Sequence, residues 1–308
     1  MQVGIPATAL DDDGGRAHGR CGRSSPCGAY PCVYERAARV VETWGLPGTS
    51  SMNDLAGSFD KGNRAQIQAQ VDYYARRRPV RMLAVDTPYV RRHFAEAMRV
   101  VDLGEGERVC EWGAGMGRFS VLFAQRGCAL TAIELSPQLA AICRQNIEGR
   151  PQSRVEVGDI LEVMNSLEAT YTLVAGFFML HHLHDLQPYF RAARRVLLPG
   201  GRLVFVEPNP LNPLYLVQII CTPGMRLREE SGIYRMWPKA IQRAAEAAGF
   251  ESFRTLRYGF LPRAPYNLAA RIGVERWPEY LTPVQLRPFQ IFTARLSAAI
   301  SPSKTTTR

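Results

Sequence analysis

The middle of the chain alternates short apolar runs with longer stretches in which apolar residues recur at helical spacing. The strand-like runs are RVCEW (108–112), ALTAIE (129–134), RVEVGD (154–159), YTLVAGFF (171–178) and GRLVFVE (201–207). Parallel strands require crossover connections, which are usually helices, so this alternation predicts an α/β, doubly wound, mostly parallel Rossmann-like sheet.

Local residues predict where individual helices begin and end. Ser136 fits an N-cap, Pro137 the first helical position and Gly149 the end of one helix. The helical pattern over 184–201 should stop before Pro199. The stretch ILEVMNSLEAT (160–170) is expected to be a loop.

Beyond residue 207 the pattern predicts a helix at 237–250, a sixth strand at 252–260 and an antiparallel seventh strand at 288–296. About thirty residues separate the last two strands, whereas hairpin loops commonly have two to five. We expect substrate-lid insertions over about 208–236 and 260–287, the second being aromatic and Pro-rich. A completed core or a dimer interface is the alternative for these residues.

The N-terminal part differs in composition. Residues 1–51 are rich in Gly, Asp, Arg, Ser and Pro, which predicts a disordered tail, and Met52 is a candidate start residue. Residues 52–100 are expected to form a helical cap, with helices over 64–77 and 87–101, and residues 101–300 the main domain.

Composition narrows the class of protein. The 308 residues are 46% hydrophobic, and no apolar run approaches the eighteen or so residues of a membrane span. The first thirty residues lack an apolar signal core, so we expect a cytoplasmic protein. Seven cysteines without a CxxC pair argue against a disulfide framework; Cys21, Cys27 and Cys32 are either a loose metal cluster or unpaired thiols in the tail. The net charge of +10 favours anionic partners, such as an acidic membrane face, an acidic substrate or nucleic acid.

The stretch EWGAGMGR (111–118) follows the first predicted strand. In α/β sheets, ligands bind at the carboxyl ends of strands, and glycines there let a ligand lie against bare backbone. A tight turn with nothing bound is the alternative. Arg118 follows Gly117, where a dinucleotide fingerprint needs a small residue, so NAD is disfavoured.

Two carboxylates follow in register. Glu134 ends the second strand, where it can accept hydrogen bonds from both hydroxyls of a ribose. Asp159 ends the third strand, where it can face an adenine amino group, with Ile160 beside the ring.

In this order VCEWGAGMGR, IELSPQ, VGDI, LVAGFFMLHHLHD and RRVLLPGGRLVFVEP resemble the class I S-adenosylmethionine-dependent methyltransferases, over roughly residues 65 to 260. FMLHHLHD followed by RVLLPGG is similar to the methyltransferases of quinone biosynthesis and of natural products. The fourth strand departs from the family by beginning with Tyr171-Thr172 instead of Phe-Asp.

This resemblance implies S-adenosylmethionine as cofactor. It places the methionine portion on Glu111 and on the loop from Gly113 to Gly117, the ribose at Glu134 and the adenine at Asp159 and Ile160. The chain around Phe177 would hold the cofactor amino group, and a tyrosine of VDYYARRRP would close over the cofactor. The implied cofactor-binding residues are Tyr74, Glu111, Gly113, Ala114, Gly115, Gly117, Glu134, Leu135, Asp159, Ile160 and Phe177.

Methyl transfer needs a nucleophile held in line, and an acceptor hydroxyl also needs a base, for which histidine is the usual neutral-pH choice. His181 and His182 lie just after the fourth strand, so we expect one of them to be the base. The alternative is that they cap or pack a helix. No metal site of paired carboxylates with an asparagine is evident.

The sequence thus predicts an S-adenosylmethionine-dependent methyltransferase that acts by O- or C-methylation on a small apolar or amphiphilic, lipid-like acceptor. We expect peripheral membrane contact through the Arg-rich helices and no nucleic-acid partner. A protein or nucleic-acid methyltransferase and a catalytically silent cofactor-binding subunit remain alternatives, and the oligomeric state is open.

Overall fold

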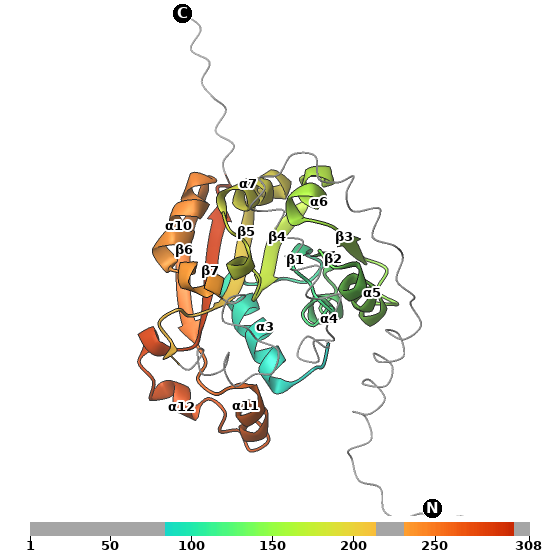
Figure 1. The fold of residues 1–308 in the computed structure, drawn as a ribbon. Coiled ribbons are helices and arrows are strands. Elements are labelled where there is room, and N and C mark those ends of the chain that lie inside the picture. The colour runs from blue at the N-terminus through green and yellow to red at the C-terminus, as the bar shows by residue number, and fades with distance from the viewer. Residues whose placement is uncertain (1–83, 214–230, 299–308) are drawn as a thin grey trace, which may run out of the picture. The chain divides into compact units, whose positions relative to one another are not determined.

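The structure is a computed structural model that describes residues 84–213 and 231–298. Within these residues, seven strands form one sheet (Figure 1). The strand order is β3-β2-β1-β4-β5-β7-β6. The strands are β1 (Arg108–Trp112), β2 (Ala129–Glu134), β3 (Ser153–Val157), β4 (Tyr171–Phe177), β5 (Leu197–Pro208), β6 (Phe250–Tyr258) and β7 (Phe289–Leu296). Neighbours from β3 to β5 are parallel, whereas β7 is antiparallel to both β5 and β6. The predicted doubly wound sheet with an antiparallel last strand is confirmed.

Helices cover both faces of the sheet. One face packs against α6 (Ile160–Ser166), α7 (Gln187–Val196) and α10 (Pro238–Ala247), and the other against α3 (Pro88–Val101), α4 (Ser120–Gln125) and α5 (Pro137–Asn146) (Figure 1). Short 3-10 turns lie at η2 (Leu180–His182) and η3 (Ser231–Arg235). Two separate apolar cores result, one on each side of the sheet.

Capping residues explain where these helices begin. The Ser136 hydroxyl accepts a hydrogen bond from the Leu139 N–H, which confirms Ser136 as the cap of α5. The helix α7 ends at Val196, before Pro199 as predicted.

The loop expected over 160–170 is wrong, because residues 160–166 form α6. Asp159 caps this helix by accepting a hydrogen bond from the Leu161 N–H at 2.8 Å. Ile160 and Met164, four residues apart, put their side chains on one helical face and into the core.

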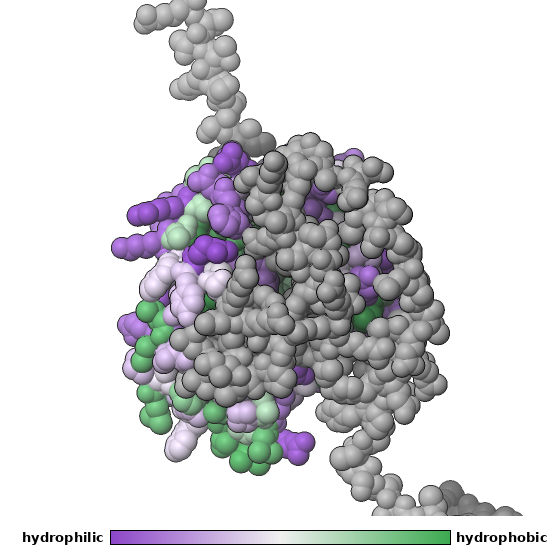
Figure 2. Space-filling view, in the orientation of Figure 1, coloured by the Kyte–Doolittle hydropathy of each residue, from purple (hydrophilic) through white to green (hydrophobic). Residues whose placement is uncertain are grey.

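The stretch between β6 and β7 carries α11 (Arg263–Ala269), α12 (Trp277–Tyr280) and η4 (Val284–Leu286). Figure 2 shows apolar side chains gathered at the lower edge of the molecule, where α11 and α12 lie in Figure 1. We call residues 263–286 the insertion below.

Some predicted features lie outside the described residues. These are the tail over 1–51, the helix over 64–77 with Tyr74, and residues 214–230 of the first predicted insertion. Among the described helices, none is long and apolar enough to span a bilayer.

Candidate functional site

The strand order reverses at β1, whose neighbours are β2 on one side and β4 on the other. Such a switch point leaves a crevice at the carboxyl ends of the strands. The loop after β1 and the turn after β4 meet there, since a Cβ built on Gly113 would lie 3.0 Å from the Met179 Cβ. The sequence segments predicted to hold a ligand are therefore adjacent in the fold.

The three alternate glycines have different physical reasons. All three take positive φ angles, +63° at Gly113, +58° at Gly115 and +83° at Gly117, which glycine adopts without strain. A Cβ on Gly117 would also lie 2.9 Å from the sulfur of Cys143 in α5, so this glycine lets a helix approach closely. Packing therefore accounts for Gly113 against Met179 and for Gly117 against Cys143, and Gly115 remains the ligand-facing candidate.

Glu134 anchors the glycine loop to the end of β2. Its buried carboxylate accepts hydrogen bonds from the Gly115 N–H at 2.7 Å and from the Ser136 N–H at 2.9 Å. Burial raises the pKa of Glu134, and these backbone hydrogen bonds oppose the rise. The Leu135 N–H also interacts with this carboxylate, which offers about four lone-pair sites, so acceptor capacity remains for one hydroxyl donor.

Glu111 lies at the end of β1 with its side chain buried. Its carboxyl group accepts a hydrogen bond from the Ser120 hydroxyl at 2.6 Å. Burial raises the pKa of Glu111 to about 8, the Ser120 hydrogen bond opposes this, and the nearby charge of Glu134 adds to it. The group is therefore mostly neutral at pH 7.

Four further predicted cofactor contacts lie in the turns that follow β1, β2 and β3. Ala114 is buried and its N–H donates to the Ile133 carbonyl at 3.0 Å, while Leu135 is half-buried next to Glu134. Burial also raises the pKa of Asp159, against the backbone hydrogen bonds that it accepts at the start of α6. The Ile160 side chain belongs to the core.

The end of β4 combines a packed ring with a strained residue. Phe177 stacks on Phe119 with ring centroids 3.8 Å apart, so its side chain is part of the core. Phe178 has a φ of +57°, and its N–H donates to the Val206 carbonyl at 2.7 Å. A bulky residue in the left-handed region costs roughly 1–3 kcal/mol and marks candidate functional sites.

The two predicted histidines have different surroundings. His181 is buried, and its Nδ1 lies 2.6 Å from a carboxylate oxygen of Glu207. His182 is half-buried, with its ring centroid 4.1 Å from that of His181. The Glu207 carboxylate therefore orients the His181 ring, because a hydrogen bond at Nδ1 fixes which ring nitrogen carries the proton.

Glu207 was not predicted from the sequence. It is fully buried at the end of β5, and it also accepts hydrogen bonds from the N–H groups of Met179 at 2.8 Å and Leu180 at 2.6 Å. One carboxylate thus holds both the imidazole and the turn that carries it. The available sequence feature was a charged residue that closes an otherwise apolar strand.

A second buried histidine was also missed. His93 in α3 lies with Nδ1 2.5 Å from the Tyr258 hydroxyl, and its ring meets that of Phe178 edge to face at 5.0 Å. Burial lowers the pKa of His93 to about 3, and the charges of Arg118 and Arg92 add to this. His93 is therefore a neutral neighbour of the strained turn.

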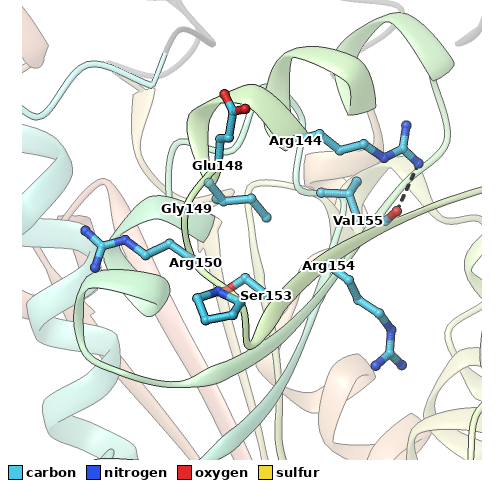
Figure 3. A pocket seen from close by; sticks show the side chains of 9 residues that line it. Arg144, Glu148, Gly149, Arg150, Ser153, Arg154 and Val155 are labelled. Carbon is cyan, nitrogen blue, oxygen red and sulfur yellow. Dashed lines mark hydrogen bonds between the residues drawn. The ribbon is translucent and has the colours of Figure 1, made fainter.

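A cavity of about 580 Å³ lies away from this crevice, at the start of β3 (Figure 3). The start of a parallel strand is the sheet edge opposite to the ligand edge. Figure 3 shows the guanidinium groups of Arg144, Arg150 and Arg154 pointing apart, and Arg144 donates to the Val155 carbonyl at 2.9 Å. The cavity lacks the converging groups of a charged-ligand site. Among the residues described, no three His, Cys, Asp or Glu side chains gather as a metal site.

Comparisons with known proteins match the same segment. Residues 110–205 match the family model described as a methyltransferase domain. The chain is 33% identical over 156 residues to a demethylmenaquinone methyltransferase of Tropheryma whipplei (strain Twist), over 47% of this chain and 63% of that protein. It is 32% identical over 116 residues to a ubiquinone biosynthesis O-methyltransferase of Xanthomonas oryzae pv. oryzae (strain PXO99A), over 37% of this chain and 48% of that protein. The chain thus matches less than two thirds of the length of either relative.

A solved structure supports the fold. A SAM-dependent methyltransferase from Archaeoglobus fulgidus superposes with a TM-score of 0.50 at 17% identity, over 67% of this chain and 94% of that chain. At 17% identity, this similarity supports only the arrangement of strands and helices.

Proposed function

We propose that this chain, whose residues 110–205 form an S-adenosylmethionine-dependent methyltransferase domain, transfers a methyl group to a small apolar acceptor that carries a ring hydroxyl. The domain match agrees with the resemblance found in the sequence. The acceptor class is supported by the two relatives, whose names place them in menaquinone and ubiquinone chemistry. The observation that carries the proposal is the pairing of the glycine loop with Glu134 beside the His181–Glu207 pair, at one edge of the sheet.

The residues present fit the cofactor. Gly115 has no Cβ, so a ligand can approach its backbone closely, and Glu134 retains acceptor capacity for a ribose hydroxyl. Glu111 is suited to the charged methionine portion, and Asp159 stands at the end of β3 for the adenine. When bound, the cofactor supplies a methyl group on a positively charged sulfur.

His181 is proposed as the base that prepares the acceptor. A hydrogen bond from Nδ1–H to Glu207 places the ring lone pair on Nε2, a buried atom, which would take the proton of an acceptor hydroxyl brought against it. The deprotonated acceptor oxygen would be the nucleophile for the methyl group that the cofactor would supply. The Glu207 carboxylate stabilises the imidazolium formed in this step, as an acid partner does in a catalytic triad.

Peripheral membrane contact belongs to the same proposal, because an acceptor of quinone type dissolves in lipid. Such contact is proposed to occur at the bilayer surface.

The test uses the full chain with S-adenosylmethionine and two probes, a reduced 2-prenyl-1,4-naphthoquinone and 3,4-dihydroxybenzoate. Mass spectrometry measures the methylated product, and calorimetry measures cofactor affinity. We expect methylation of at least one probe, and His181→Ala to lower kcat by about 100-fold to 10,000-fold with cofactor affinity retained. His184→Ala, at an exposed histidine of the same segment, is the matched control.

Two results would contradict the proposal. An unchanged kcat in His181→Ala removes this residue as the base. Methyl incorporation into bulk RNA or protein, with both probes untouched, favours a macromolecular acceptor instead.

A further inference from the structure

The insertion presents large apolar side chains to solvent. Leu281 is 82% exposed, Ile272 77% and Trp277 73%. The other exposed apolar residues of this segment are Leu268, Val274, Tyr280, Val284 and Leu286. A contiguous group of this kind is rare on a soluble surface and marks an interaction site.

The pattern of burial in the insertion is inverted. Within residues 263–286, the buried residues are Tyr266 and the charged Glu279, while the other large aliphatic and aromatic side chains are exposed. An ordinary surface helix does the opposite, with its apolar stripe turned to the core. The outward apolar face is therefore not a by-product of packing against the sheet.

Glu279 turns inward because arginines hold it there. Its carboxylate lies 2.8 Å from the guanidinium of Arg92 in α3 and 3.6 Å from that of Arg287. A buried carboxylate so placed contributes little negative charge to the outer face. The second carboxylate of the insertion, Glu275, is half-buried.

The exposed charges of the insertion are consequently positive. Arg271 and Arg276 are both exposed and flank Ile272 and Trp277 in the sequence. Arg276 also lies 3.6 Å from the carboxylate of Glu96 in α3, so Arg271 is the stronger positive charge of this face. Apolar side chains surrounded by arginines are the pattern of segments that lie in the interface of anionic bilayers. Charge therefore favours an anionic lipid surface over a neutral one.

We propose that the insertion is a membrane-docking surface, which seats Ile272, Trp277 and Leu281 at the boundary between the headgroups and acyl chains of an anionic bilayer. This inference rests on the proposed function, because docking would bring the enzyme to an acceptor dissolved in the lipid. Arg92 and Glu279 tie the docked segment to α3, which also carries His93 beside the turn after β4.

The experiment is sedimentation of the full chain with vesicles of phosphatidylcholine alone and with added phosphatidylglycerol. We expect binding to the anionic vesicles, weakened at high salt, and a loss of about tenfold or more in affinity in the triple variant Ile272→Ser, Trp277→Ser, Leu281→Ser. Arg271→Glu should weaken binding to anionic vesicles specifically. Leu198→Ser, at an exposed leucine of β5, is the matched control and should bind like the wild type.

Two results would overturn the docking surface. One is equal vesicle binding by the triple variant and the wild type. The other is a wild type that ignores vesicles but forms a dimer in light scattering, with the triple variant monomeric, because the surface is then an interface between two copies.

A separate measurement distinguishes a failure of the proposed function from a failure of the docking surface. Cofactor affinity and turnover of water-soluble 3,4-dihydroxybenzoate without vesicles test the crevice alone. Vesicle binding without turnover of any probe leaves the docking surface standing and the acceptor proposal refuted.

Discussion

Replacing Glu111 with glutamine tests how the candidate site uses a buried acid. The change keeps the size of the side chain and its capacity to accept a hydrogen bond from Ser120, while removing its ability to ionise. The substitution should raise the stability of the protein without cofactor and lower its affinity for S-adenosylmethionine.

The magnitude follows from the pKa of Glu111. A pKa of about 8 in the folded protein, against an ordinary value of 4.5, corresponds to about 5 kcal/mol of free energy of unfolding. Because the folded pKa is raised, this contribution is fully present below pH 4.5 and is lost as the pH rises through about 8. The glutamine variant lacks this loss, so it should gain stability relative to the wild type between about pH 5 and about pH 9.

Cofactor affinity should show the cost of ionising the same group. If the bound cation requires the Glu111 anion, ionisation at pH 7 costs about 1.4 kcal/mol, which is about tenfold in Kd. The wild type should therefore bind more tightly at about pH 9 than at about pH 7, relative to Glu111→Gln. The ratio of the two proteins cancels the titration of the cofactor's own amino group.

The assays are urea unfolding of both proteins at the two ends of this range and titration calorimetry with the cofactor. A stability difference that stays constant with pH would refute the raised pKa. A constant ratio of the two Kd values would refute the ionic role of Glu111 in binding.

Two further substitutions test the packing around the crevice. Gly117→Ala should lower the free energy of unfolding, measured in urea, by about 1–3 kcal/mol more than Gly127→Ala does. Both glycines have positive φ angles, but only a Cβ at position 117 would meet Cys143. Equal losses in the two variants would contradict the packing role of Gly117. His93→Asn removes a group whose folded pKa of about 3 lies below its ordinary value of 6.5, so its stabilising contribution is present above pH 6.5 and is lost as the pH falls toward 3. The free energy of unfolding of the wild type should fall by about 2–3 kcal/mol relative to that of this variant between about pH 6.5 and about pH 4.5. If the unfolding free energies of the two proteins change in parallel with pH, the lowered pKa of His93 is wrong.

The strands were predictable because central parallel strands are buried on both faces. Runs such as 129–134 are almost wholly apolar and end at residues that change the chain direction, so their positions follow from composition. The short helix α6 was missed for the opposite reason. Its seven residues give little periodicity, and its formation depends on the Asp159 cap and on the packing of Met164.

The candidate site was predictable only where residues are close in sequence or follow successive strands. Glu134 stands at a strand end, and the fold brings it to Gly115, nineteen residues away, as the register of a parallel sheet implies. Glu207 meets His181 across 26 residues, and Tyr258 meets His93 across 165. A single sequence shows that these residues are polar among apolar neighbours, but it carries no information about which of them pair.

The insertion shows a similar limit. Its length and aromatic content were visible in the sequence and suggested a lid over an apolar substrate. Which side chains face outward depends on the ion pair between Glu279 and Arg92, and these residues are 187 positions apart.

The place of the insertion in the sheet has an evolutionary consequence. It joins β6 and β7, which are antiparallel neighbours at one edge, whereas the glycine loop and Glu134 belong to β1 and β2 in the other half. Lengthening a surface connection costs only about 0.6 kcal/mol for each doubling of its length. The segment between β6 and β7 can therefore change in sequence and length during evolution, and the surface to which the protein binds can change with it. The half of the sheet that holds the glycine loop can stay the same.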